Sequence, residues 1–308
     1  MISEDKKLNI AIIGYGSWAK NYISTIYNNP SAQIKWIVSH NTNVDTIHSI
    51  NCKVLTKWQD LFEENGIDGV IVAVPPKLQL DIALRCIDKN IPLLLEKPLA
   101  LDLGTVELLL SSCKKNKSKV MVDYTYLYNP AFRKALDSLH LIGPIKKIVS
   151  IGGNFGPFRD TCPVLWDWAP HDVSMCIRLM DEVPKILSAK KEYIKIKSQQ
   201  GEIIESKLLF SNGTQANLIF GNGMRNKKRL LKIVGEYGEL VFNDSIKDKL
   251  KIVQDSYSTE IPIDFKPPLE LLTEDFFAMI RKNIKSYSDV VFSTYVTKVI
   301  SDIEYSMC

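Results

Sequence analysis

The segment Leu8-Asn-Ile-Ala-Ile-Ile-Gly-Tyr-Gly-Ser-Trp-Ala19 leads an aliphatic run into a glycine-containing turn. We expect a buried strand over Leu8–Ile13, because a continuous aliphatic run that ends at a breaker is typical of a parallel sheet. Gly14 then allows a tight turn, Gly16 lets the backbone approach a pyrophosphate, and Ala19 keeps the following helix close to the strand. A helix that starts here offers unpaired N–H groups to phosphates. The segment therefore predicts a nicotinamide or flavin dinucleotide site, with a purely structural turn as the alternative.

Short strands and helices alternate through the first part of the chain. The strands are expected at Leu8–Ile13, Gln33–Val38, Gly69–Val74, Ile91–Leu95 and Lys119–Val122. The amphipathic helices are expected at Trp18–Asn28, Trp58–Glu64, Leu78–Asp88 and Leu103–Lys115. Strict alternation with short connections predicts an α/β fold with a doubly wound parallel sheet, a Rossmann dinucleotide-binding domain over residues 1–123.

Strands dominate the chain after residue 123. They are expected at Lys146–Gly153, Leu187–Ile196, Ser206–Phe210, Thr214–Phe220, Leu230–Val234 and Glu239–Phe242. Helices are expected from Pro130 and over His171–Met180, Pro268–Asn283 and Ser293–Ser306. Because Asn212-Gly213 between two strand-like runs is a strong hairpin signal, residues 124–308 are predicted to form an α+β domain with a large, mostly antiparallel open sheet. This domain would bind substrate and form oligomers, and the sequence leaves open whether its last helix packs back on the first domain.

The composition excludes several classes of function. The 308 residues are 45% hydrophobic and 24% charged, which is ordinary for a soluble globular protein, and 39 basic against 35 acidic side chains leave a net charge of +4. This excess is spread along the chain, so neither nucleic acid nor a membrane surface is expected as a partner. No apolar run approaches the roughly 20 residues of a membrane span, and no signal peptide is recognisable, so a cytoplasmic protein is expected. The six cysteines stand at no metal-ligand spacing, and we expect neither disulfides nor zinc.

A second aliphatic run, Leu94-Leu95-Glu96-Lys97-Pro98, ends in an acid, a base and a proline. Proline restricts the preceding residue to extended conformations, so Lys97 stays at the exit of the strand. Ligands bind at this exit in open parallel sheets. Val74-Pro75-Pro76 ends another strand at the same edge, where its prolines provide a stiff shelf beside a cofactor. An ordinary charged loop and a capped strand end are the alternatives for these two segments.

The second strand ends at Ser39, His40 and Asn41, where an NAD site usually places an acid to hold the ribose 2′-hydroxyl. No acid stands there, and no arginine is present to hold a 2′-phosphate. Because these three side chains can hydrogen-bond either ribose, the sequence leaves the choice between NAD and NADP open.

A histidine that follows a proline is the candidate proton carrier. Pro170 suits the first position of a helix, which predicts that His171 lies in the opening turn. A helix N-terminus disfavours the imidazolium, so a neutral histidine that can accept a proton is expected. Asp167 would reach the imidazole from the preceding loop and fix its tautomer. The alternative is a structural histidine with Asp167 as a helix cap.

The order of these motifs resembles the glucose–fructose oxidoreductase / inositol dehydrogenase / MocA (Gfo/Idh/MocA) family, over nearly the whole chain. The resemblance rests on Gly14-x-Gly16-x-x-Ala19, Val74-Pro75-Pro76, Glu96-Lys97-Pro98, Asn129-Pro130 and Asp167-x-x-x-His171. It implies an NAD(P)-dependent oxidoreductase that transfers a hydride between the nicotinamide and a secondary hydroxyl or keto carbon of a sugar. The residues at 165–172 look most like members that act on sugars or nucleotide sugars in polysaccharide biosynthesis.

The resemblance also implies roles for individual residues. Lys97 would hydrogen-bond the reacting oxygen, His171 would move the proton and Asp167 would support it, and the bond before Pro98 is often cis in this family. The implied cofactor-binding residues are Gly14, Tyr15, Gly16, Ser17, Trp18, Ser39, His40, Val74, Pro75, Gln79, Glu96 and Lys97. The candidates to line a sugar pocket are Tyr124, Tyr126, Asn129, Trp166 and Trp168, with core packing as the alternative for the aromatic rings.

The chain departs from the family pattern at three places. Gln79 stands where many members carry histidine, Tyr124 stands where histidine or glycine is frequent, and the ribose acid is missing. A redox-silent dinucleotide-binding regulatory protein and a reductase of a non-sugar substrate, such as a dihydrodiol or a linear tetrapyrrole, are therefore the competing hypotheses. Because an open apolar sheet face needs a cover, a homodimer or homotetramer is expected.

Overall fold

The computed structural model describes residues 6–40, 51–196, 198–247, 249–255 and 257–307. The chain divides into two compact units, and each unit is built from two stretches of sequence. The first unit is Met1–Asp123 with Leu269–Thr294, and the second is Tyr124–Pro268 with Tyr295–Cys308. Residues 269–294 therefore return to the first unit, whereas the prediction has a single division after residue 123.

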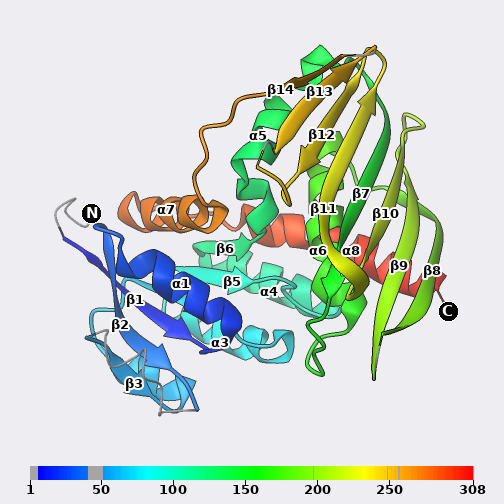
Figure 1. Ribbon diagram of the computed structural model, residues 1–308. Coiled ribbons are helices and arrows are strands. Elements are labelled where there is room, and N and C mark those ends of the chain that lie inside the picture. Colours follow the sequence, from blue (N-terminus) through cyan, green and yellow to red (C-terminus); the bar gives the residue numbers. More distant parts are fainter. Residues whose placement is uncertain (1–5, 41–50, 197, 248, 256, 308) are drawn as a thin grey trace. The chain divides into compact units, whose positions relative to one another are not determined.

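The first unit contains a parallel six-stranded sheet in the order β3-β2-β1-β4-β5-β6, which confirms the predicted doubly wound fold (Figure 1). Its strands are β1 (Leu8–Ile13), β2 (Ala32–Val38), β3 (Lys53–Leu55), β4 (Gly69–Val72), β5 (Leu93–Glu96) and β6 (Val120–Asp123). Every residue of β4, β5 and β6 is buried. These strands are continuous aliphatic runs because helices cover both of their faces.

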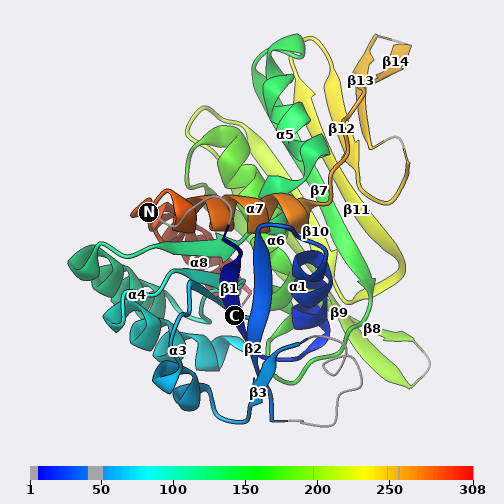
Figure 2. The same ribbon diagram turned by 90° about the vertical axis from the view of Figure 1, so that its left-hand side faces the viewer.

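The helices of this unit are α1 (Ser17–Tyr27), α3 (Pro76–Asp88), α4 (Leu103–Asn116), α7 (Pro268–Arg281) and the first part of α8 (Ser288–Ser306), whose remainder belongs to the second unit. Figure 2 shows α1 on one side of the strands and α3 and α4 on the other. The segment predicted as a helix at Trp58–Glu64 is instead a 3-10 helix, η1 (Trp58–Glu63), and the three-residue β3 was not predicted.

The returning segment closes the free edge of β6. The backbone N–H of Val120 donates to the Ser286 carbonyl (2.8 Å), and the N–H of Val122 donates to Asp289 (3.1 Å). Arg281 donates to the carbonyls of Lys6 and Ser31, both at 2.9 Å. The bonds from Val120 and Val122 supply partners to an edge strand whose backbone groups would otherwise face solvent.

The second unit contains an eight-stranded sheet in the order β14-β13-β12-β11-β7-β10-β9-β8. Its strands are β7 (Ile145–Phe155), β8 (Lys185–Ile196), β9 (Gln199–Leu209), β10 (Gln215–Gly221), β11 (Gly223–Gly235), β12 (Glu239–Asn243), β13 (Leu250–Gln254) and β14 (Tyr257–Glu260). Only the pairing of β10 with β7 is parallel among those described. The mostly antiparallel sheet is confirmed, and β13 and β14 were missed.

The predicted hairpin at Asn212-Gly213 is confirmed. It joins β9 to β10 in antiparallel register, and Gly213 has φ +84°, a conformation that suits glycine. The N–H of Gly213 donates to the Phe210 carbonyl (3.0 Å) and the N–H of Phe210 donates to the Thr214 carbonyl (2.9 Å). The turn therefore fixes the register of both strands.

Besides the C-terminal part of α8, four described helical segments belong to the second unit. They are η2 (Thr125–Tyr128), α5 (Pro130–Asp137), η3 (Leu139–Leu141) and α6 (Val164–Met180). The expectation that a helix starts at Pro170 is wrong, because α6 begins at Val164 and contains Pro170 in its interior. An interior proline costs a helix about 3 kcal/mol. Burial of Leu165, Trp166 and Ala169 on the preceding turns offsets this cost.

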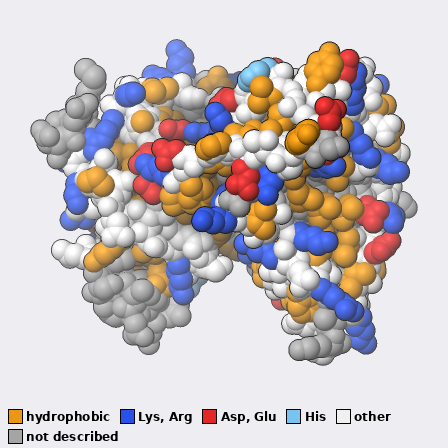
Figure 3. All heavy atoms as spheres, turned by 45° about the horizontal axis from the view of Figure 1, so that its top comes forward, with side chains coloured by type: hydrophobic (Ala, Val, Ile, Leu, Met, Phe, Trp, Pro, Cys, Tyr) orange, Lys and Arg blue, Asp and Glu red, His pale blue; other side chains and the backbone are white. Residues whose placement is uncertain are grey.

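No described helix is long and apolar enough to cross a membrane. On the face shown in Figure 3, Lys and Arg side chains are scattered among acidic and hydrophobic ones. This distribution agrees with the predicted spread of the basic excess along the chain.

Candidate active site

The turn after β1 has the geometry that a pyrophosphate requires. Gly14 has φ +107°, and a Cβ on it would lie 2.2 Å from the carbonyl oxygen of Ala73, so no other residue fits. A Cβ on Gly16 would meet no heavy atom of the described residues within 4 Å. Gly16 is the N-cap of α1 and brings no side chain to bond the N–H groups of the first turn. This open space in front of a helix N-terminus fits the phosphates of a dinucleotide.

The predicted cofactor-binding residues lie at the ends of parallel strands, which share one edge of the sheet. Ser39 follows β2 and is buried, and exposed His40 comes next, while Asn41 lies outside the described residues. Val74 follows β4, and Pro75 is the N-cap of α3. Tyr15 and Ser17 follow β1. The Tyr15 ring centroid lies 5.3 Å from the ammonium of Lys20, and Ser17 is the first residue of α1.

The segment Glu96-Lys97-Pro98 lies at the end of β5, and its Lys97–Pro98 peptide bond is cis. Glu96 is the last residue of the strand and is 8% exposed. Gln79 on α3 is 1% exposed and donates from Nε2 to the carbonyl oxygen of Pro98 (3.0 Å). The glutamine that replaces the frequent histidine therefore ties the start of α3 to the loop that carries Lys97.

Glu96 faces a second acid that sequence reasoning missed. Asp123 is its register partner on β6 and is fully buried. Asp123 Oδ2 accepts a hydrogen bond from the hydroxyl of Tyr22 (2.6 Å) and another from Nε1 of Trp18 (3.1 Å). Burial, reinforced by the negative charge of Asp123, raises the pKa of the Glu96 carboxyl well above its ordinary value, and Lys97 only partly opposes this.

The two carboxyl groups form a buried acidic pair, and the Tyr22 hydroxyl and the Trp18 indole both donate to Asp123 Oδ2. Trp18 was predicted to contact the cofactor, and the structure shows its indole bound to this acid. The signal available in the sequence was an acid that breaks the aliphatic run Val120–Val122 at the same edge as Glu96.

In the second unit, α6 carries the predicted proton carriers. Asp167 and His171 are four residues apart on this helix, so their side chains emerge from the same face. His171 lies near the middle of α6, so the argument that a helix N-terminus keeps it neutral does not apply. Nη1 of Arg159 donates to Oδ1 of Asp167 (2.8 Å), and the Asp167 side chain is 11% exposed.

Tyr126 joins His171 to a cluster of aromatic and cationic side chains. The ring of Tyr126 on η2 meets the imidazole edge to face, with centroids 5.0 Å apart. The guanidinium of Arg229 on β11 lies 5.1 Å from the Tyr126 ring centroid and 4.7 Å from that of Trp168 on α6. Burial raises the pKa of the Tyr126 phenol, and Arg229 partly opposes the rise. The sequence did not single out Arg229 as a site residue, because it lies in a run of basic residues of the kind that is usually exposed.

A buried acid lies beside this cluster. Asp172 is 1% exposed, and its Oδ1 accepts a hydrogen bond from Ser150 on β7 (2.5 Å). Burial raises the pKa of the Asp172 carboxyl, and both the positive charge of Arg229 and the Ser150 hydroxyl oppose the rise. Gly152 lies opposite, where a Cβ would be 2.1 Å from Arg229 Nη1 and 2.9 Å from Asp172 Oδ2. Because Gly152 has no side chain, the guanidinium of Arg229 can occupy this space.

Three predicted sugar-binding residues have contacts inside the fold. Trp166 is 2% exposed and donates from Nε1 to Glu304 (3.2 Å). Asn129 is 1% exposed, caps α5 by accepting from the N–H of Ala131 (2.9 Å), and donates to Asp244 (3.2 Å). Tyr124 is 4% exposed. These contacts favour packing and capping roles for Trp166 and Asn129, whereas Trp168 and Tyr126 stand beside His171.

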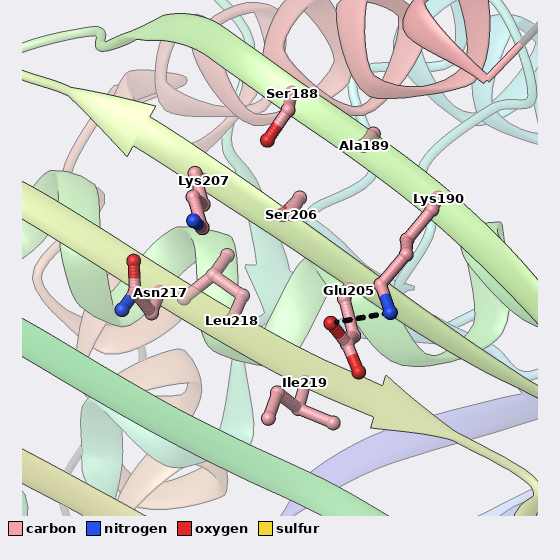
Figure 4. Close-up of a pocket in the computed structure, with 9 residues that line it drawn as sticks. All are labelled: Ser188, Ala189, Lys190, Glu205, Ser206, Lys207, Asn217, Leu218 and Ile219. Atoms are coloured by element: carbon pink, nitrogen blue, oxygen red, sulfur yellow. Dashed lines mark ion pairs between the residues drawn. The ribbon is translucent and has the colours of Figure 1, made fainter.

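A pocket of about 450 Å³ lies elsewhere in the second unit, on β8, β9 and β10 (Figure 4). Its lining mixes Leu218 and Ile219 with polar side chains, and the ammonium of Lys190 pairs with Glu205 (3.1 Å). No predicted site residue lines it. Within the described part of the chain, no group of three or more His, Cys, Asp or Glu side chains could hold a metal ion.

The chain is similar to known oxidoreductases. Residues 8–124 match the family described as "Oxidoreductase family, NAD-binding Rossmann fold". A protein of Magnetospirillum magnetotacticum MS-1 that is assigned as an oxidoreductase is 30% identical, with a TM-score of 0.86 over 96% of this chain and 99% of that one.

Two more distant structures share the fold. Biliverdin reductase from Synechocystis sp. PCC 6803, solved with biliverdin and NADP⁺, is 20% identical and has a TM-score of 0.83, over 97% of this chain and 99% of that one. KijD10, a 3-ketoreductase from Actinomadura kijaniata solved with NADP and TDP-benzene, is 15% identical and has a TM-score of 0.87, over 98% of each chain. The full-length similarity, the matching Rossmann unit and the motifs at the strand ends lead to one conclusion. The chain belongs to the Gfo/Idh/MocA family of NAD(P)-dependent oxidoreductases.

Proposed function

We propose that this oxidoreductase transfers a hydride between the nicotinamide and a secondary hydroxyl or keto carbon of a sugar, with nucleotide sugars as the favoured class. The observation that carries the proposal is the cluster of Tyr126, Trp168 and Arg229 around His171. Aromatic rings pack on the C–H faces of sugars, and polar groups among them select hydroxyls. A neighbour with the same fold, KijD10, is a ketoreductase solved with a TDP-linked ligand, which supports the choice.

Three residues would perform the proton chemistry. Lys97 would hydrogen-bond the reacting oxygen, and His171 would accept the hydroxyl proton as the carbon loses its hydride, or return it during reduction. Asp167 would hold the imidazole in the productive orientation from one turn earlier on α6. The cofactor supplies hydride acceptance or donation, so the protein contributes positioning and a path for the proton.

The proposed cofactor site uses the open edge of the parallel sheet. Gly14, Tyr15, Gly16, Ser17 and Trp18 would surround the pyrophosphate, and Ser39 and His40 would lie beside the ribose. Val74, Pro75, Gln79, Glu96 and Lys97 would form the nicotinamide side. The open space at Gly16 and the tight turn at Gly14 support this assignment.

The proposal is tested with purified protein, NAD⁺ or NADP⁺ and their reduced forms, and a panel of free sugars and sugar nucleotides. A change in nicotinamide absorbance with a sugar or sugar nucleotide is expected. If no member of the panel supports turnover while biliverdin or a dihydrodiol does, the sugar assignment is wrong.

A non-sugar substrate is the second candidate. A neighbour with the same fold reduces biliverdin, and the stacked guanidinium of Arg229 would also suit the carboxylates of a linear tetrapyrrole. A redox-silent role for the fold would require that no substrate class changes the nicotinamide absorbance at all. The same panel separates these three outcomes.

We also propose a homodimer or homotetramer that assembles on the outer face of the second sheet. Leu230, Ile151 and Ile219 are half-buried and stand side by side across β11, β7 and β10. A row of apolar side chains on an open sheet face favours contact with a second copy of the same face. The cytoplasm is the proposed location.

A further inference from the structure

We propose that Arg229 anchors a negatively charged group of the substrate, either a carboxylate or a phosphoryl oxygen, beside His171. This inference rests on the proposed function and narrows it, because a neutral sugar would leave the arginine without its ligand. Arg229, Tyr126, Trp168, His171 and Asp172 all belong to the second unit.

The first support is the orientation of the guanidinium. Tyr126 and Trp168 hold it at 5.1 and 4.7 Å from their ring centroids, and Tyr126 in turn packs against His171. Aromatic faces attract the cation, and a guanidinium is more weakly hydrated than an ammonium, so little water needs to be displaced from it. A planar fork held in this way is ready to bind two oxygens of one anion.

The second support is one guanidinium nitrogen that the described part of the chain leaves without a hydrogen-bond partner. Nη1 of Arg229 is buried and has no hydrogen-bond partner among the described residues, although Asp172 Oδ2 lies across the space that Gly152 leaves open. Arg229 as a whole is partly exposed. Asp172 can therefore attract one edge of the guanidinium while the other edge meets a ligand.

The third support is the charge of β11 next to this position. Arg225, Lys227 and Lys228 are exposed and precede Arg229 directly. The register with β7 jumps between Gly223 and Lys228, so an irregularity of the strand lies immediately before Arg229. Bulges re-aim side chains near functional sites, and clustered positive charge raises the local concentration of anions.

The test measures binding rather than turnover, so its result does not depend on redox activity. Full-length protein without added dinucleotide is titrated by calorimetry with four probes: UDP-glucuronate, UDP-glucose, glucuronate and glucose. The same titrations are made with Arg229→Gln. The matched control is Arg133→Gln, because Arg133 also stacks on a tyrosine of the second unit, Tyr128, at 4.6 Å.

Arg229→Gln is expected to raise Kd for the anionic probes by about tenfold to 100-fold and to change Kd for glucose by less than about twofold. Arg133→Gln should leave all four values unchanged. A selective loss for the two glucuronates identifies a carboxylate as the anchored group, and an equal loss for both UDP-sugars identifies the diphosphate. Equal losses for charged and neutral probes, or no loss, would overturn the proposal.

A second variant covers the case in which Arg229→Gln does not fold. Arg229→Lys keeps a positive charge beside Asp172 but loses the planar fork and its stacking. It is expected to bind anionic probes about tenfold more weakly than the wild type with glucose affinity unchanged. If nicotinamide turnover fails with every sugar while this selectivity holds, the redox proposal is wrong and the anion site stands. If turnover succeeds without the selectivity, only the anion site is wrong.

Discussion

At the scale of single residues, the ends of β5 and β6 hold two buried acids. Glu96 and Asp123 face each other across neighbouring strands, and both Tyr22 and Trp18 donate to Asp123. Burial and the neighbouring Asp123 disfavour a second negative charge here and raise the pKa of Glu96, so we expect the pair to hold one proton between them. The local charge at the strand exit is therefore set by one carboxylate and one ammonium.

This assignment predicts how stability depends on pH. The folded pKa of Glu96 is raised, so its contribution to stability is complete below the ordinary pKa of a glutamate and is lost as the pH rises toward the folded pKa. As the pH rises above the ordinary pKa of a glutamate, the wild type should lose up to about 1.4 kcal/mol of stability per pH unit relative to Glu96→Gln, until the folded group titrates. Urea unfolding at several pH values measures this difference. Glu107→Gln, which alters an exposed carboxyl on α4, should run parallel to the wild type, and a parallel Glu96→Gln curve would refute the shared proton.

The turn glycine permits a second prediction at this scale. Gly14→Ala places a Cβ within 2.2 Å of the Ala73 carbonyl oxygen in a φ of +107°, so the turn must move. Dinucleotide affinity should fall by about tenfold or more, since each misplaced phosphate contact costs on the order of 1–3 kcal/mol. Fluorescence titration with NADPH and NADH measures it. Gly213→Ala, also at a positive φ but in the hairpin of the second unit, serves as the control and should keep the wild-type affinity.

At the scale of elements, α5 shows how a motif residue can act through structure alone. Asn129 belongs to the Asn129-Pro130 motif, yet its amide caps the helix and binds Asp244 inside the fold. Asn129→Ala should lower the free energy of unfolding by about 1–2 kcal/mol and leave kcat and KM of the folded enzyme unchanged. Asp102→Ala removes the cap of α4 and should cost a similar amount. A rise in KM for Asn129→Ala alone would show that the residue contacts substrate.

The helix α6 shows where sequence rules gave the wrong boundary. Proline at a first helical position is a sound local rule, but the buried side chains that precede Pro170 make the helix start one and a half turns earlier. Alternation of strands with helices was predictable because it is written in local periodicity. The strand β14 was not predictable from such periodicity, because Tyr257–Glu260 is exposed throughout and carries no apolar alternation. The neighbouring strand β13 was also not predicted.

At the scale of the whole molecule, the sequence indicated the turn glycines and the charged strand exit because each motif is contiguous. Asp123 and Arg229 could not be found in this way. The partners of Asp123 are Glu96, 27 residues earlier, and Trp18, 105 residues earlier. Arg229 lies against Trp168, which is on another element. Only the folded chain brings these residues together. The resemblance to a family supplied roles for Lys97 and His171, whereas their surroundings had to come from the structure.

The proposed assembly is a prediction at this scale. Light scattering at micromolar concentration should give the mass of a dimer or tetramer of the 34.9 kDa chain. Ile219→Lys, which adds charge to the apolar row on the outer face, should shift the mass toward the monomer, because like charges would face each other across a symmetric interface. Tyr257→Lys, at an exposed position on β14, should leave the mass unchanged. A monomeric wild type would rule out the assembly.

The central claim is that Lys97 and His171 act in hydride transfer coupled to proton transfer. The most direct measurement is the rate of nicotinamide absorbance change for Lys97→Ala, His171→Ala and the control His140→Ala, with folding checked by circular dichroism. Since general acid–base help is worth about 100- to 10,000-fold, the first two variants should lose at least tenfold in kcat. His140 is exposed on η3 and its replacement should leave kcat unchanged. Folded Lys97→Ala and His171→Ala proteins that both turn over at the wild-type rate would contradict the account.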